Sequence, residues 1–142
     1  MGNSCGVRRR CCVVLDTNML MLAYKGIDIF TQIEELLTTK CEFIVLRKVC
    51  DELVNILNKG SPKERKAAQY ALKLVEKYCK IVDYEEPDIQ KVDELILLYA
   101  LNNKCFIASN DKELRRKARA LGLPEIYFRE EKQMLEASEE FI

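Results

Sequence analysis

Short apolar runs alternate with longer segments of helical spacing, and this alternation restricts the possible folds more than any other feature of the chain. The runs are Cys12–Leu15, Glu42–Leu46, Cys105–Ala108 and Glu125–Phe128, with Ile81–Val82 as a shorter candidate. Runs of this length without a polar face are typical of strands that are buried between helices. The sequence therefore predicts an α/β fold with three layers, α/β/α, around a central parallel sheet of four or five strands.

The segments between these runs carry apolar residues three and four positions apart, which indicates helices. Pro62 and Pro87 mark two helix starts, because proline is favoured in the first turn. The chain has 142 residues, so we expect a single domain over 1–142, with 1–10 as a flexible N-terminal arm. The predicted helices are one that begins near Met19, then Asp28–Thr38, Arg47–Leu57, Pro62–Tyr78, Asp88–Asn102, Lys112–Ala120 and an acidic amphipathic helix over Glu130–Phe141.

Composition excludes several classes of protein. The longest apolar stretches are far shorter than the roughly 20 residues that cross a bilayer, so we expect no membrane association through a spanning helix. The formal net charge is zero, so any affinity for nucleic acid must come from a local patch. The chain has no histidine, which removes Ser-His, Cys-His and His-metal chemistry together.

The cysteines point to a reducing compartment. There are seven, an odd number, and no two have the Cys-x-x-Cys spacing of a zinc knuckle. Most lie among apolar neighbours, where a reduced thiol behaves as a small hydrophobic group. We therefore expect reduced cysteines and a cytoplasmic protein.

Two acids stand where strands give way to helices. Asp16 follows the first apolar run and Asp111 follows the run Cys105–Ala108. In parallel sheets, ligands bind beyond the carboxyl ends of the strands, which is where both acids should lie. Each could equally be a helix cap, because aspartate accepts hydrogen bonds from the free amides of the first turn.

Two further acids are placed on predicted helices. Asp93 falls near the middle of the apolar face of Asp88–Asn102, where an unpaired charge is costly and is normally paired or bound to a metal. A salt bridge to a Lys or Arg from another element is the alternative. Glu52 lies at the edge of the apolar arc of its helix, whereas Asp51 points away, and Glu52 could also be a surface residue.

If these four acids meet at one place, their oxygen ligands would select Mg²⁺ or Mn²⁺ rather than zinc. A cluster of like charges repels itself, so a cation would stabilise it in the folded state. Phosphoryl transfer is the chemistry that commonly uses such sites, since the metal polarises the phosphate and activates water. The four residues are Asp16, Glu52, Asp93 and Asp111.

The order of these motifs resembles that of the PIN domain ribonucleases. Val13–Asn18, which reads Val-Val-Leu-Asp-Thr-Asn, is similar to that family's opening motif. Glu52, Val92–Leu97 and Ile107–Leu114 then follow in the family's order, and the resemblance spans roughly Cys12 to Phe128. It implies a PIN-like α/β sandwich that cleaves RNA endonucleolytically with Mg²⁺ or Mn²⁺, with the same four acids as the catalytic and metal-binding residues.

The resemblance also implies roles for neighbouring residues. Asn18, Ser109 and Asn110 would orient carboxylates or water around the metal, with Ser109 standing where many relatives have threonine. The basic stretch after Asp111 is closest to the branch of the family that processes ribosomal RNA. Its Arg115, Arg116 and Arg119 would contact RNA, and Arg8–Arg10 could add a flexible basic arm; the alternative is a solvated helix face.

Other functions remain open. The chain could be a toxin-type PIN ribonuclease of a toxin–antitoxin pair, or a weakly catalytic PIN module that binds RNA or protein. Glu130–Phe141 could then be a surface for a homodimer or a protein partner. An aspartyl phosphatase of the haloacid-dehalogenase type also begins with a strand that ends in Asp, but it needs a second acid two residues later, where this chain has Asn18.

Overall fold

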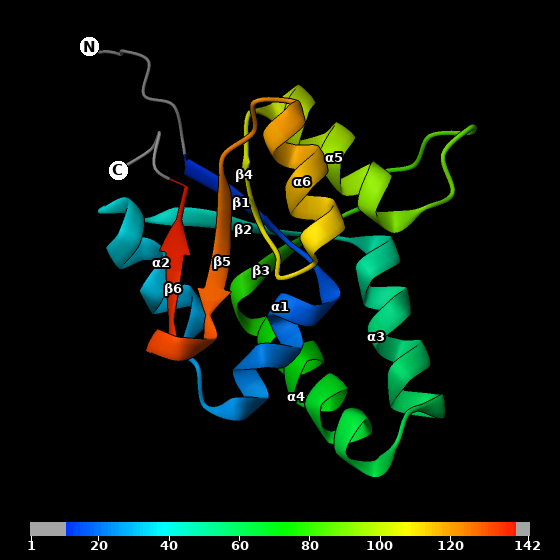
Figure 1. The fold of residues 1–142 in the computed structure, drawn as a ribbon. Helices are drawn as coiled ribbons and strands as arrows, with labels where there is room; N and C mark the ends of the chain where they lie inside the picture. Colours follow the sequence, from blue (N-terminus) through cyan, green and yellow to red (C-terminus); the bar gives the residue numbers. More distant parts are fainter. Residues whose placement is uncertain (1–10, 139–142) are drawn as a thin grey trace.

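The central feature of the fold is a six-stranded sheet in which β1 is an inner strand (Figure 1). The structure is a computed structural model that describes residues 11–138. The strand order is β3-β2-β1-β4-β5-β6; the first five are parallel, and β6 runs antiparallel to β5. The predicted parallel sheet is therefore confirmed, with one antiparallel strand added at its edge. The strands are β1 (Cys11–Leu15), β2 (Cys41–Leu46), β3 (Cys79–Val82), β4 (Phe106–Ala108), β5 (Glu125–Arg129) and β6 (Met134–Ala137).

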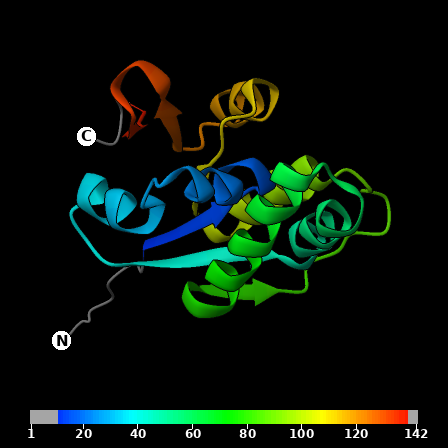
Figure 2. The same cartoon turned by 90° about the horizontal axis from the view of Figure 1, so that it is seen from below.

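Helices flank this sheet, as Figures 1 and 2 show. α1, α3 and α4 pack against one another, whereas α5 and α6 pack together against β1, β4 and β5. None of the helices in the described part of the chain has the length and apolar character needed to cross a bilayer. The helices are α1 (Thr17–Leu22), α2 (Ile29–Leu37), α3 (Arg47–Lys59), α4 (Pro62–Tyr78), α5 (Val92–Asn103) and α6 (Lys112–Ala120), with 3₁₀ turns at Ala23–Lys25 and Glu130–Lys132.

The core follows directly from the apolar runs. Val13, Val14 and Leu15 are fully buried in the central strand, because helices cover β1. Residues of several helices pack on the same cluster, among them Met19, Ile33 and Leu53. The central strands are thereby removed from water, and their ends are where polar side chains can meet, whereas the edge strand β3 remains partly exposed.

Two predicted helices are wrong in extent or kind. α5 begins at Val92 rather than Asp88, because Glu86 and Ile89 form a β-bridge and Pro87 lies in that turn. Glu130–Phe141 is not a helix: its described part is a 3₁₀ turn followed by β6, and residues 139–142 lie outside the described residues, as do 1–10 with their arginines. In β6, Leu135 and Ala137 are buried and the residues before them are more exposed, a two-residue period that belongs to a strand.

Two disulfides overturn the prediction that the cysteines are reduced. Cys11 is bonded to Cys41 and Cys12 to Cys105, so β1 is linked to both of its neighbours. Cys11 and Cys41 are direct partners in the register of β1 and β2. The paired cysteines are 30 and 93 positions apart in the sequence. They meet only because of the order of the strands in the sheet, so no short cysteine spacing in the sequence indicates the pairing. Of the other described cysteines, Cys50 is a free thiol, and burial raises the pKa of Cys79 to about 12.

Reducing the two disulfides should destabilise the chain substantially. Loop-closure entropy predicts a loss of about 3 to 5 kcal/mol in the free energy of unfolding for each bond, with the larger loss for Cys12–Cys105 because it closes the longer loop. Urea unfolding with and without reductant measures this loss. A variant in which all four bonded cysteines are alanine should show no response to reductant.

A thiol titration in denaturant provides the independent check. Without reductant, at most three of the seven cysteines should react. Reaction of all seven in freshly purified, unreduced protein would show that the bonds do not form.

Candidate active site

The four predicted acids line one cavity of about 350 Å³ at the carboxyl edge of the sheet. Asp16 follows β1, Asp111 follows β4, Glu52 comes from α3 and Asp93 from α5. The cavity also has polar walls from Thr17, Asn18 and Asn55 and apolar walls from Ile56, Val92, Ile96 and Leu114. The topology therefore brings together acids that are up to 95 positions apart because neighbouring parallel strands end at the same edge.

Asp16 is the most buried of the four acids, with 7% of its surface exposed. Its Oδ1 accepts a hydrogen bond from the Met19 amide at 2.9 Å, and its Oδ2 accepts one from the Ser109 hydroxyl. Burial raises the pKa of Asp16 to about 6, an effect that these hydrogen bonds oppose and the nearby charges of Asp111 and Glu52 reinforce. Asp16 is thus both the cap of α1 and a carboxylate under repulsion from its neighbours.

Asp111 is tied to Asp16 through Ser109. The Ser109 hydroxyl, which is fully buried, accepts a hydrogen bond from the Asp111 amide at 3.0 Å while it donates to Asp16. The Asp111 side chain caps α6, with Oδ1 accepting from the amides of Glu113 and Leu114 at 2.9 and 3.3 Å. The predicted contact between Ser109 and a carboxylate is present in the structure.

Glu52 is held by a residue that sequence reasoning overlooked. Thr17, the first residue of α1, donates its hydroxyl to Glu52 Oε1 at 2.5 Å. Glu52 itself is exposed, which fits its predicted place at the edge of the apolar arc of α3. The only signal for Thr17 was its place between Asp16 and Asn18 in the opening motif.

Asp93 is less buried than the sequence suggested. α5 starts at Val92, so Asp93 lies in its first turn, where the helix dipole favours a negative charge. Its side chain is 26% exposed, and Oδ2 lies 3.4 Å from Nζ of Lys117 on α6. The salt bridge that was the alternative for Asp93 is therefore present, and the same carboxylate also lines the cavity.

The other residues predicted around the site divide into two groups. Asn18 lines the cavity, as expected of a residue that would orient a ligand. Asn110 points elsewhere: its Oδ1 accepts a hydrogen bond from the Phe128 amide at 2.8 Å, so it fastens β5 instead of contacting one of the four acids.

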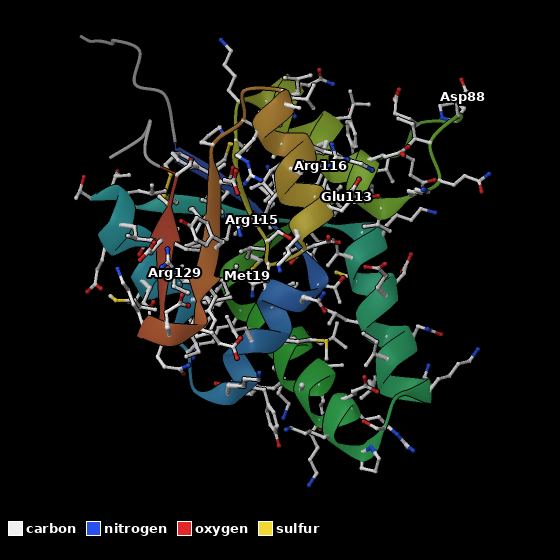
Figure 3. The ribbon with its side chains drawn as sticks, in the orientation of Figure 1. Met19, Asp88, Glu113, Arg115, Arg116 and Arg129 are labelled. Atoms are coloured by element: carbon white, nitrogen blue, oxygen red, sulfur yellow. A yellow bond between two sulfur atoms is a disulfide. The ribbon has the colours of Figure 1, made fainter. Side chains whose placement is uncertain are left out.

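The three arginines of α6 have partners within the protein. Arg115 and Arg119 both pair with Glu125, which is 1% exposed, at 2.6 and 3.0 Å. Arg115 also lies over the Tyr127 ring, 3.7 Å from its centroid. Arg116 pairs with Glu113 one turn away, and Figure 3 labels both residues. This arrangement gives Arg115 and Arg119 a structural role as counterions of a buried carboxylate that was not anticipated.

The donor set of the cavity suits a hard divalent cation. All four acids offer oxygen, and neither a cysteine nor a histidine lines the cavity. As the side chains stand, no three acids, cysteines or histidines within residues 11–138 are close enough to hold a metal together. Thr17 and Lys117 hold Glu52 and Asp93 in place, so those two side chains would have to turn for a metal to bind.

This geometry defines a nuclease-like acidic site at the end of a parallel sheet, and comparison with known proteins agrees. The profile of the PIN like domain family matches residues 13–131, so the chain belongs to that family. It is similar to Ribonuclease VapC9 of Archaeoglobus fulgidus, with 34% identity over 87% of each chain. It is also similar to Ribonuclease VapC4 of Methanocaldococcus jannaschii, with 36% identity over 84% of this chain and 92% of that one.

Two solved structures share the fold. The PIN domain endonuclease Utp24 matches 89% of this chain and 90% of its own, with a TM-score of 0.71 and 19% identity. VapBC2 from Rickettsia felis, solved with a DNA fragment from its promoter, contains a chain that matches 74% of this one and 92% of its own, with a TM-score of 0.56 and 21% identity. At these identities the two structures support the PIN-like fold.

Replacing Asp16 by asparagine should stabilise the metal-free chain at neutral pH. The folded-state pKa of Asp16 is raised above its unfolded value, so its ionised form opposes folding above pH 6 and the opposition disappears as the pH falls towards 4. Asp16→Asn should therefore raise the free energy of unfolding by about 1 to 3 kcal/mol at pH 7.5 and hardly change it near pH 4. Urea unfolding in EDTA at both pH values measures this difference; an equal effect at both would contradict the assigned pKa.

Proposed function

We propose that this chain is a divalent-metal-dependent endoribonuclease that hydrolyses RNA phosphodiester bonds in the cavity at the carboxyl edge of the sheet. The observation that carries the proposal is the convergence of Asp16, Glu52, Asp93 and Asp111 on one cavity whose ligands are all oxygen. Membership of the PIN family and similarity to two proteins named as ribonucleases support the ribonuclease assignment.

The four acids would hold Mg²⁺ or Mn²⁺. The cation, when bound, polarises the phosphate and lowers the pKa of the attacking water. Four carboxylates alone would repel a phosphate, and a cation held by them would offset that repulsion. The chain's own residues set part of the geometry: Ser109 and the Met19 amide orient Asp16, whereas Glu52 would leave its bond to Thr17 to reach the cation. Ile96 and Leu114 exclude bulk water from one side of the site.

The relatives favour a toxin-type role over the processing of ribosomal RNA. Both curated relatives are VapC ribonucleases at 34% and 36% identity. The likeness to the endonuclease Utp24, at 19% identity, concerns the fold alone and does not favour the ribosomal branch. A toxin-type ribonuclease implies an antitoxin protein that controls it, so the proposed partners are RNA and such a protein.

Cleavage should depend on the four acids and not on their neighbours. A mixed-structure RNA incubated with Mn²⁺ should be cut by the native chain, and each of Asp16→Asn, Glu52→Gln, Asp93→Asn and Asp111→Asn should lower the rate at least about a hundredfold, since each removes a charged ligand. Asp51→Asn and Glu94→Gln are matched controls, because each acid adjoins a proposed ligand but does not line the cavity. Equal losses in the controls would contradict the assignment.

The same experiment separates the alternative functions. A pure binding module would retain RNA without cutting it in any metal. An aspartyl phosphatase would instead release phosphate from small phosphoesters, and it would lose activity with Asp16→Asn alone.

Removing Lys117 should tighten metal binding. Its ammonium group competes with a cation for Asp93, so Lys117→Met should raise the affinity for Mn²⁺ by about two- to fivefold. Calorimetric titration of Mn²⁺ measures this change. The control is Lys40→Met, which lies at the amino ends of the strands and away from the cavity. Unchanged or weaker Mn²⁺ binding in Lys117→Met would show that the Lys117–Asp93 pair does not compete with the metal.

A further inference from the structure

One face of α4 carries a row of exposed basic residues interrupted by an aromatic ring. Lys63, Lys66, Tyr70, Lys73 and Lys77 follow one another at intervals of three or four residues, so they form a single stripe along the helix. All five are exposed, and α4 lies on the outside of the molecule, as Figure 2 shows. We call these five residues the α4 stripe.

The lysines of the α4 stripe lack carboxylate partners. Within residues 11–138, no salt bridge involves any of the four. The nearby acid Glu64 is occupied in the capping box of α4, where it accepts a hydrogen bond from the Ser61 amide. In a chain of zero formal net charge, this stripe is therefore a local positive surface.

Exposed aromatic rings accompany the charges. Tyr70 packs edge-on against Tyr24, with ring centroids 6.1 Å apart, although about two fifths of each side chain remains open to solvent. One end of the α4 stripe has a third ring, Tyr78, which is 49% exposed and lies beneath the Lys77 ammonium at 5.2 Å. Tyrosines with open edges beside lysines are the combination that binds the bases and phosphates of single-stranded nucleic acid.

This surface is continuous with the acidic cavity. Asn18 lines that cavity and also a second hollow of about 390 Å³, which has Tyr24, Lys25 and Lys63 in its wall. Tyr24 then leads through its ring contact to Tyr70 and a third hollow, of about 300 Å³, which ends at Tyr78. A chain of side chains thus runs from the four acids, past Asn18, to the middle of α4.

We propose that this path binds single-stranded RNA on one side of the scissile phosphate, with unpaired bases against Tyr24 and Tyr70 and phosphates against Lys25 and the lysines of the α4 stripe. The proposal rests on the proposed ribonuclease function and adds the surface on which the RNA lies beside the cavity. Charge favours RNA over a protein occupant, because the path presents five lysines that form no salt bridge with any residue of 11–138. The only acids that line its two hollows, Glu64 and Asp28, accept hydrogen bonds at the starts of α4 and α2.

Binding of RNA in EDTA, where cleavage does not occur, tests the path separately from catalysis. The probes are a fluorescent oligouridine of about twelve nucleotides and one of about four, within the site sizes of single-strand binders. Tyr24→Ser with Tyr70→Ser should weaken binding of the longer probe at least about fivefold and change the shorter one less. Tyr70→Phe alone should retain affinity, because the ring remains.

Charge reversal tests the phosphate contacts. The double variant Lys66→Glu with Lys73→Glu should lower the affinity for the longer probe. It should also reduce the slope of log affinity against log salt concentration by about 1.4, the value for two lost phosphate contacts on a single strand. The matched control is Lys40→Glu with Lys104→Glu, two exposed lysines that precede β2 and β4 at the opposite edge of the sheet. The control should retain the native affinity and slope.

Three outcomes would overturn the proposal. The first is undiminished RNA affinity in the serine and glutamate variants, and the second is an equal loss of affinity for a duplex RNA of the same length. The third is a set of variants that keep RNA affinity but change the oligomeric state in light scattering, which would make the surface a protein interface. The nuclease proposal fails separately. RNA that binds along the path but is not cut with Mn²⁺ would refute catalysis and leave the path intact.

Discussion

The pairing of β1 with β4 is the contact on which the site depends. It places Leu15 opposite Ala108, and the Asp16 amide extends the ladder by donating to the Ala108 carbonyl at 3.2 Å. Directly beyond this pair, the Ser109 hydroxyl bridges Asp16 and the Asp111 amide. Two helices then start at the same edge, each capped by one of these aspartates. Capping does not remove these residues from the cavity, since both aspartates still line it. At Asp16 the Met19 amide binds Oδ1 and the Ser109 hydroxyl binds Oδ2, whereas at Asp111 the amides of Glu113 and Leu114 both bind Oδ1.

Four carboxylates around one cavity repel one another. The fold limits the free-energy cost of this repulsion in a different way at each of the four positions. The helix dipole favours Asp111 and Asp93 at the starts of α6 and α5, and first-turn amides also bond to Asp111. Thr17 does not neutralise the charge of Glu52, but its hydroxyl donates a hydrogen bond to one carboxylate oxygen. Lys117 is the counterion of Asp93. Asp16 forms no salt bridge with the residues of 11–138 and has little contact with solvent, and burial raises its pKa to about 6. The residual strain is concentrated at Asp16, the acid at the end of the central strand, where a bound cation would bring the largest relief.

The sequence predicts the parallel sheet well, and it places Asp16 and Asp111 directly after strands as the structure does, because both features depend on local patterns: apolar runs and helix caps. It predicts poorly whatever depends on distant residues meeting. Lys117 and Arg115 look alike as cations on α6, yet one faces Asp93 and the other a buried Glu125. The disulfides, the Thr17 contact and the partner of Asn110 were missed for the same reason. The strand β6 was missed because charged residues with helical spacing hid the two-residue alternation of Leu135 and Ala137.

The disulfides and the acids lie at opposite ends of the same three strands, and this arrangement has a mechanical consequence. Sliding β4 by one residue along β1 would turn Ser109 to the other face of the sheet and separate it from Asp16. Cys12 and Cys105 stand one position before the first register pair of β1 and β4, Val13 and Phe106, so the bond between them opposes such a slip. Cys11–Cys41 does the same for β1 and β2. With sliding opposed, rotation of side chains is the movement by which the acids can respond to their mutual repulsion. That limited freedom is what Glu52 and Asp93 need in order to turn from Thr17 and Lys117 towards a cation.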